Sequence, residues 1–210
     1  MPKLRLIITA LLLTALYGCS SVSMKLSQSD KNNITSVYIP APKITAAKMY
    51  YMGPGAALLY GLGPVAGSLA ATQASKGPGS TLLYYAKSKG ITIEDIVKES
   101  VIEKLHQDRI FKVSDTKENS DAFLEIEIPH YGFTVSNGFS STVIPVLKYT
   151  CRLKNASNRV IWEATQSIGI FGNDIEGFKP ASTVANPNLI SASWKQAADE
   201  IAAEIIPTLK

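Results

Sequence analysis

The segment 121-DAFLEIEIPH-130 decides the fold, because its side chains alternate between apolar and charged. Leu124, Ile126 and Ile128 fall on one side of an extended chain, while Glu125 and Glu127 fall on the other. This alternation is typical of a strand that buries one face and leaves the other in water. The segment therefore predicts a sheet that is covered on one side.

The neighbouring segments predict the rest of this sheet. Residues 142–155 alternate in the same way, and residues 159–171 return after a short polar turn, which predicts a hairpin. The pair Asn137-Gly138 in front of them is a strong turn signal. Two shorter strands are expected earlier in the chain, at 34–40 and 109–114.

Two amphipathic helices are expected to cover the sheet. Thr92 is a candidate N-cap for a helix over 92–108, since apolar residues recur there at helical spacing and Glu94 and Asp95 occupy the first turn. A second helix is predicted over 189–206, with Trp194 on its apolar face. The pattern indicates a two-layer α+β domain over 34–210, with a mostly antiparallel sheet of about five strands under two helices.

The first residues of the chain have the form of an export signal. Lys3 and Arg5 precede the uncharged run Leu6–Leu16, which is too short to cross a bilayer but typical of a secretory signal. The alternative is a buried strand that carries a free cysteine.

The sequence Leu16-Tyr17-Gly18-Cys19 resembles the lipobox of bacterial lipoproteins. That resemblance implies cleavage between Gly18 and Cys19, removal of residues 1–18, and a diacylglycerol on the Cys19 sulfur. Ser20 implies an outer-membrane location facing the periplasm, because an Asp at that position marks retention in the inner membrane. Residues 19–33 are polar after the cysteine and predict a flexible tether.

An apolar insert over 49–75 is the least ordinary part of the sequence. It contains no charged residue and is long enough to span a bilayer, but several Gly and Pro residues interrupt it. Gly63 and Gly67 have the spacing of close helix packing in lipid. Three interpretations stay open, namely a helical hairpin or loop packed on the domain or on a partner, a membrane-touching or assembly element, and a disordered linker.

Aromatic pairs flank this insert. Tyr50-Tyr51 and Tyr84-Tyr85 suit either the headgroup level of a bilayer or ordinary core packing. The candidate contacts with a membrane or partner are Tyr50, Tyr51, Gly63 and Gly67.

Composition and motifs give little support for catalysis. The net charge is +4 and no dense Lys/Arg run follows residue 18, so nucleic acid is not an expected partner. Of the two cysteines, Cys19 is assigned to lipid, and Cys151 is expected to be a small core residue. His106 and His130 lie in no metal-binding spacing. We expect no enzyme activity, no metal and no cofactor.

The order of elements also resembles a known group of envelope domains. "DAFLEIEI" after a helix and a short strand, followed by a hairpin ending in "VIWEA", is similar to the amino-terminal domain of the Tol-system propeller protein and to the curli secretion lipoprotein. Several small envelope lipoproteins are similar too. The resemblance implies a scaffold or assembly role and transfers no catalytic residue.

Two functional hypotheses follow. The first is a lipid-anchored, non-catalytic interaction or assembly component of an envelope transport, secretion or surface-assembly system, with envelope proteins or further copies of itself as partners. The second is a carrier of a small ligand or lipid, in which the apolar insert lines a pocket.

Overall fold

The computed structural model describes residues 21–54, 77–136, 140–169 and 175–210. A long meander forms the centre of the sheet, made of β6 (Ala122–Val135), β7 (Val143–Asn155) and β8 (Val160–Ile168). Both pairings in the meander are antiparallel, and β6 and β7 share a continuous register from Ala122↔Asn155 to Val135↔Val143 with one bulge after Glu127. The predicted hairpin of the last two strands is confirmed, while the Asn137-Gly138 turn lies outside the described residues.

The N-terminal part of the chain closes the β6 side of the meander. Three short strands, β2 (Ser36–Tyr38), β3 (Lys43–Ile44) and β4 (Tyr50–Met52), follow one another along β6 and all pair with it in parallel. They amount to one interrupted strand, broken where Pro40 and Pro42 remove backbone donors. The short strand β5 (Lys112–Ser114) then pairs with β2.

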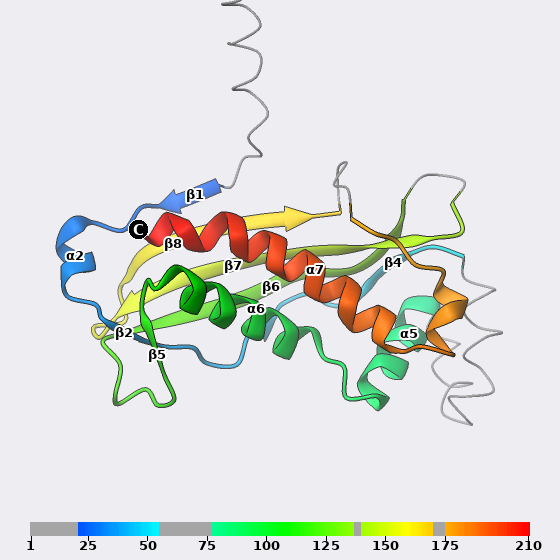
Figure 1. The fold of residues 1–210 in the computed structure, drawn as a ribbon, viewed down its shortest axis with the longest axis horizontal. Helices are drawn as coiled ribbons and strands as arrows, with labels where there is room; N and C mark the ends of the chain where they lie inside the picture. The colour runs from blue at the N-terminus through cyan, green and yellow to red at the C-terminus, as the bar shows by residue number, and fades with distance from the viewer. Residues whose placement is uncertain (1–20, 55–76, 137–139, 170–174) are drawn as a thin grey trace, which may run out of the picture.

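The opposite edge holds the first strand that the structure describes. Strand β1 (Ser21–Met24) pairs antiparallel with β8, with Ser21 opposite Thr165 (Figure 1). A short helix, α2 (Gln28–Asn32), follows, capped by the Ser27 hydroxyl. The structure thus differs from the predicted flexible tether over 19–33, because residues 21–24 gain ladder hydrogen bonds from a distant strand edge that the local sequence does not reveal.

Within the described ranges the sheet has eight strands in place of the expected five. The additional strands β1, β3 and β4 contain four, two and three residues, too few for an alternation pattern to be recognised. The fold class is confirmed as α+β, but the sheet is mixed, since the antiparallel meander carries parallel strands on its β6 side.

The two predicted helices cover one face of this sheet. Helix α6 (Ile93–Asp108) begins after Thr92, whose hydroxyl caps the Asp95 amide, and α7 (Asn188–Ile205) lies beside it (Figure 1). Trp162 of β8 and Trp194 of α7 are fully buried, and the Trp194 ring stacks on Phe133 at a centroid distance of 5.3 Å. The Tyr149 hydroxyl donates to the Ala198 carbonyl at 3.0 Å, which joins β7 to α7.

A further helix was not predicted. Gly77, Pro78 and Gly79 are typical of a turn, yet α5 spans Pro78–Ser88. Pro78 stands in the first turn of the helix, where its missing amide proton costs nothing. Two buried residues hold this helix to the domain, since Leu82 has no exposed surface and the Tyr85 hydroxyl donates to the Thr183 carbonyl at 3.1 Å. Tyr85 therefore packs in the core. Two short 3-10 helices flank α7, with η2 (Pro180–Thr183) before it and η3 (Ile206–Leu209) after it.

One carboxylate joins β2 to the start of β6. The Asp121 Oδ2 atom accepts hydrogen bonds from the backbone amides and the hydroxyls of Thr35 and Ser36, at 2.8–2.9 Å. These donors favour the charged form, with the Thr35 amide first, and lower the pKa of Asp121 to about 2.

We predict that Asp121→Asn lowers the free energy of unfolding near neutral pH by about 1 kcal/mol, because the four donors lose their charged acceptor. The loss stays small because the carboxylate is exposed and screened by water. A depressed pKa contributes stability above about pH 4 that is lost as pH falls toward 2, so wild type and variant should converge in that range. Urea unfolding over this pH range measures the difference. Asp115→Asn, on a nearby turn, is the control, and an equal effect of both changes contradicts the assigned role.

Candidate functional site

The candidate site lies on the face of the sheet that the two long helices leave uncovered. We call this face the open face. Along β6 and β7 its side chains alternate with the buried ones that meet the helices, and they divide into a paired-charge half near β1 and an aromatic half near β4.

In the paired-charge half, Arg152 on β7 lies between two carboxylates. Its guanidinium forms ion pairs with Glu127 on β6, at 2.5 Å, and with Glu163 on β8. Glu163 also accepts a hydrogen bond from the Ser23 hydroxyl of β1 at 2.6 Å. Beside this group, Lys154 pairs with Glu125 at 2.7 Å. The row of charges therefore runs across the three strands of the meander, and the Ser23 hydroxyl joins β1 to it.

The ionisation of these carboxylates follows from their partners. Arg152 is the main cause that lowers the pKa of Glu127, whereas the Ser23 hydroxyl and then Arg152 lower the pKa of Glu163. Both groups are thus held as anions, which suits a structural ion pair and not a proton donor. An open hollow of about 460 Å³ lies over this half, lined in part by Pro40, Lys43 and Arg152.

The aromatic half is built on β4 and the facing end of β6. The ring of Tyr50 lies 5.2 Å from the ring of His130, and the Tyr50 hydroxyl reaches the Met52 sulfur at 3.6 Å. Both Tyr50, at 36%, and Met52, at 49%, are exposed. Lys148 on β7 is paired in register with His130 and is also exposed.

Gly132 makes room for this arrangement. Its φ is +147°, and a Cβ placed there would lie 1.8 Å from the Tyr50 carbonyl oxygen. The backbones of β4 and β6 therefore meet at a point where no side chain fits. With no side chain at this position, Tyr50 and Val146 flank the glycine on the open face.

Tyr51 points the other way, as the next residue along a strand must. It packs against the helix-side core, where burial raises the pKa of Tyr51 to about 12, and its buried hydroxyl has no hydrogen-bond partner among the described residues. The structure thus separates the two tyrosines that the sequence grouped, and leaves only Tyr50 accessible on the open face. Met52 and Lys148 were missed, because only the β4–β6–β7 pairing brings them near Tyr50.

The remaining predicted site residues lie outside the described residues, namely the cleavage and lipidation residues Gly18 and Cys19 and the candidate contacts Gly63 and Gly67. The carrier hypothesis depends on the same undescribed part of the insert, and it stays a prediction. Within the described ranges, no helix is long and apolar enough to cross a bilayer.

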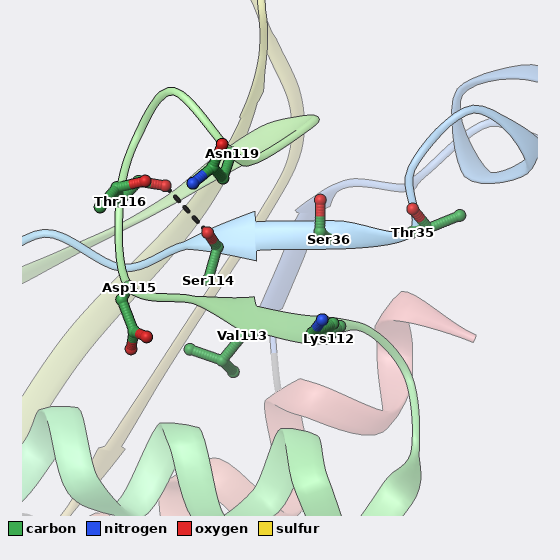
Figure 2. A pocket seen from close by; sticks show the side chains of 8 residues that line it. All are labelled: Thr35, Ser36, Lys112, Val113, Ser114, Asp115, Thr116 and Asn119. Atoms are coloured by element: carbon green, nitrogen blue, oxygen red, sulfur yellow. Dashed lines mark hydrogen bonds between the residues drawn. The ribbon is translucent and has the colours of Figure 1, made fainter.

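A second, polar hollow of about 590 Å³ lies where β2 and β5 run side by side. It is lined by Thr35, Ser36, Asn119 and residues 112–116, and Figure 2 shows the Ser114 hydroxyl donating to the Thr116 carbonyl across its rim. The hydroxyls of Thr35 and Ser36 are already committed to Asp121. The hydroxyl groups that line this hollow are therefore already used to hold β2 to Asp121 and to close the turn after β5.

The residues weighed for chemistry have structural surroundings. Cys151 is completely buried, as predicted, and burial raises the pKa of its thiol. His106 is exposed near the end of α6, while His130 is partly covered by Tyr50. Among the residues that the structure places, no group of three His, Cys, Asp or Glu side chains is arranged to hold a metal ion.

The comparisons with known proteins bear on the fold and not on the function. No protein-family model and no curated protein matches the chain. Among solved structures it is similar to a DUF330 protein from Xanthomonas campestris, with 11% identity over 89% of this chain and 90% of that one and a TM-score of 0.42. The PelC dodecamer from Paraburkholderia phytofirmans gives 11% identity over 88% and 96% and a TM-score of 0.38. Lipoprotein GNA1162 from Neisseria meningitidis gives 19% identity over 79% and 99% and a TM-score of 0.28. These likenesses assign no function.

We predict that Gly132→Ala lowers the free energy of unfolding by about 3 kcal/mol, since the new methyl group forces β4 away from β6. Gly90→Ala is the matched control. Gly90 also has a positive φ, +72°, but nothing lies within 4 Å of its added Cβ, so its cost should be about 1 kcal/mol. Chemical denaturation measures both, and equal costs would show that β4 does not depend on this close approach.

The paired-charge half gives a second prediction. Arg152→Gln leaves Glu127 and Glu163 without their shared cation and should cost about 1–2 kcal/mol of stability, with a smaller cost in high salt. Lys154→Gln removes a single, partly exposed ion pair with Glu125 and should cost under about 0.5 kcal/mol. Urea unfolding at low and high ionic strength separates the two, and equal losses would contradict a bridging role for Arg152.

Proposed function

We propose that this chain is a lipid-anchored lipoprotein of the outer membrane, with its domain in the periplasm, that acts as a non-catalytic interaction component of an envelope system. Its anchor would be the acylated Cys19, which becomes the first residue once residues 1–18 are removed. Its partners would be envelope proteins or further copies of itself.

The observation that carries the proposal is the position of β1. Ser21 is paired with Thr165 of β8, so only Ser20 separates Cys19 from a strand of the sheet. Two residues of extended chain span about 7 Å. Acyl chains on Cys19 would therefore hold the β1–β8 edge at the membrane surface, and the domain would not move on a long tether.

Several contacts keep this first segment on the domain. Ser23 donates to Glu163, Val22 packs partly against the core, and Arg159 pairs with Asp30 of α2 at 3.3 Å. A direct connection between an anchor and a sheet suits a protein that presents a surface in a fixed place. The ion pairs of Arg152 with Glu127 and Glu163 stabilise the sheet, and Cys151 is buried in the core. These surroundings support a role in binding a partner over a role in catalysis.

We predict that the protein isolated from membranes begins at Cys19 and has the added mass of a diacylglycerol and an N-acyl chain. The mature-length chain with Cys19→Ser, exported by a cleavable signal, should lack that mass and leave the membrane fraction in a high-salt wash, because stable anchoring needs more than one acyl chain. Intact-mass spectrometry and fractionation check both. An unmodified mature protein, or acylation that survives Cys19→Ser, contradicts the anchor.

The interaction role has its own test, which does not depend on that mass. Chemical cross-linking of the acylated protein in its membrane should give discrete species that contain a second envelope protein or a second copy. A chain that remains single under all conditions and is purified with a bound small molecule or lipid would contradict this role and favour a carrier.

A further inference from the structure

Exposed apolar side chains are few in the described part of the chain, and two of them touch. Met24, Tyr50 and Met52 are the exposed large hydrophobic residues there, and the Tyr50 hydroxyl contacts the Met52 sulfur. Scattered apolar residues on a surface need no explanation, but a contiguous group indicates an interaction site. A tyrosine, with its apolar ring and polar tip, suits the boundary between lipid and water.

Two lysines, Lys48 and Lys148, lie near this pair. Lys148 stands opposite His130, whose ring lies 5.2 Å from the Tyr50 ring, and Lys48 and Tyr50 both line a third hollow of about 350 Å³. Neither lysine forms a salt bridge with any residue that the structure describes, whereas Arg152 and Lys154 in the paired-charge half are matched by carboxylates. The aromatic half therefore complements an anionic surface.

The proposed anchor lies at the edge of the same sheet. The Ser23 hydroxyl of β1 meets Glu163 in the row of charges on the open face, so this face runs without interruption from β1 to β4. Four strand spacings of about 4.8 Å, about 19 Å, separate the two across the sheet, and the offset from Thr150 to Val146 in the register adds about 13 Å along it. A flat bilayer surface easily spans that distance.

Taken with the anchor proposed above, on which this inference rests, the geometry points to a docking surface for anionic phospholipid headgroups, formed by Tyr50, Met52, His130 and Lys148. The open face lies on the bilayer, and Lys48 adds to the attraction at its margin. Helices α6 and α7 lie on the opposite face of the sheet (Figure 1). In this orientation they face the periplasm, where partners can reach them.

The first experiment removes the acyl anchor and keeps the domain. The mature-length chain with Cys19→Ser, exported by a cleavable signal, is mixed with vesicles that contain phosphatidylglycerol and with vesicles of phosphatidylcholine alone. We expect binding to the anionic vesicles that weakens with added salt. Lys148→Gln should weaken it about fivefold, the effect of one cation near an anionic surface. The double change Tyr50→Ser and Met52→Ser should weaken it further.

Matched controls fix the location. Lys112→Gln removes an exposed lysine from β5, and Lys117→Gln removes an exposed lysine from the turn after β5. Both should leave binding within about twofold, since no charge is lost from the aromatic half. Equal binding to both vesicle types, no binding at all, or equal loss in the controls overturns the proposal. Because this chain has no acyl group, its failure leaves the Cys19 mass, and hence the proposed anchor, untouched.

A second measurement uses the acylated protein. Cys151 is buried and Cys19 carries lipid, so Met52→Cys supplies an accessible thiol for an environment-sensitive dye, and Glu99→Cys on the exposed side of α6 is the control. On vesicles, the dye at position 52 should shift to the blue and be quenched by nitroxide lipids, while the dye at position 99 should not. Identical spectra at the two positions, or protection of position 52 by a protein and not by lipid, overturn the proposal.

Discussion

The constraint on which the structure depends is the single buried face of the β6–β7–β8 meander. Leu124, Cys151 and Trp162 stand on that face without exposed surface, and α6 and α7 cover them. Because a strand alternates sides at every residue, this choice assigns the remaining side chains of the meander to the open face. The row of charges around Arg152 and the position of Lys148 both follow from it.

The same constraint explains the two edges. A meander leaves two strand edges with unpaired backbone groups, which a protein must cover or blunt. Here one early stretch of chain supplies both covers, since β1 lies on β8 and the run from β2 to β4 lies along β6. Asp121 binds the start of that run through hydrogen bonds, and Gly132 leaves room for the backbone of β4 at its end. The segment from β1 to β4 is thus an integral part of the sheet.

Much of this fold could be predicted from the sequence, because the long strands and both amphipathic helices have clear periodicity. The boundaries of α6 and α7 agree with the predicted helices to within one residue. Strands β1, β3 and β4 could not be predicted, since each contains two to four residues and gains its stability from partners far along the chain. Helix α5 was hidden because Gly77, Pro78 and Gly79 indicate a turn, while the burial of Leu82 and Tyr85 decides the outcome.

The candidate site was predicted in part. The sequence identified Tyr50 and Tyr51 as a pair, but only their place in a strand shows that one faces solvent and the other the core. Met52 and Lys148 joined the site through strand pairing, which no local pattern reports. The charges divide in the same way, because the partners of Arg152 come from two other strands.

Amide hydrogen exchange of the acylated protein on vesicles tests most directly whether the anchor is joined to the sheet. If β1 stays paired with β8, the Val22 and Met24 region should exchange slowly, with protection close to that of the facing part of β8. Exchange of residues 21–26 at the rate of an unstructured peptide, while β7 and β8 remain protected, would show that the domain moves on a flexible tether and would contradict the proposed attachment.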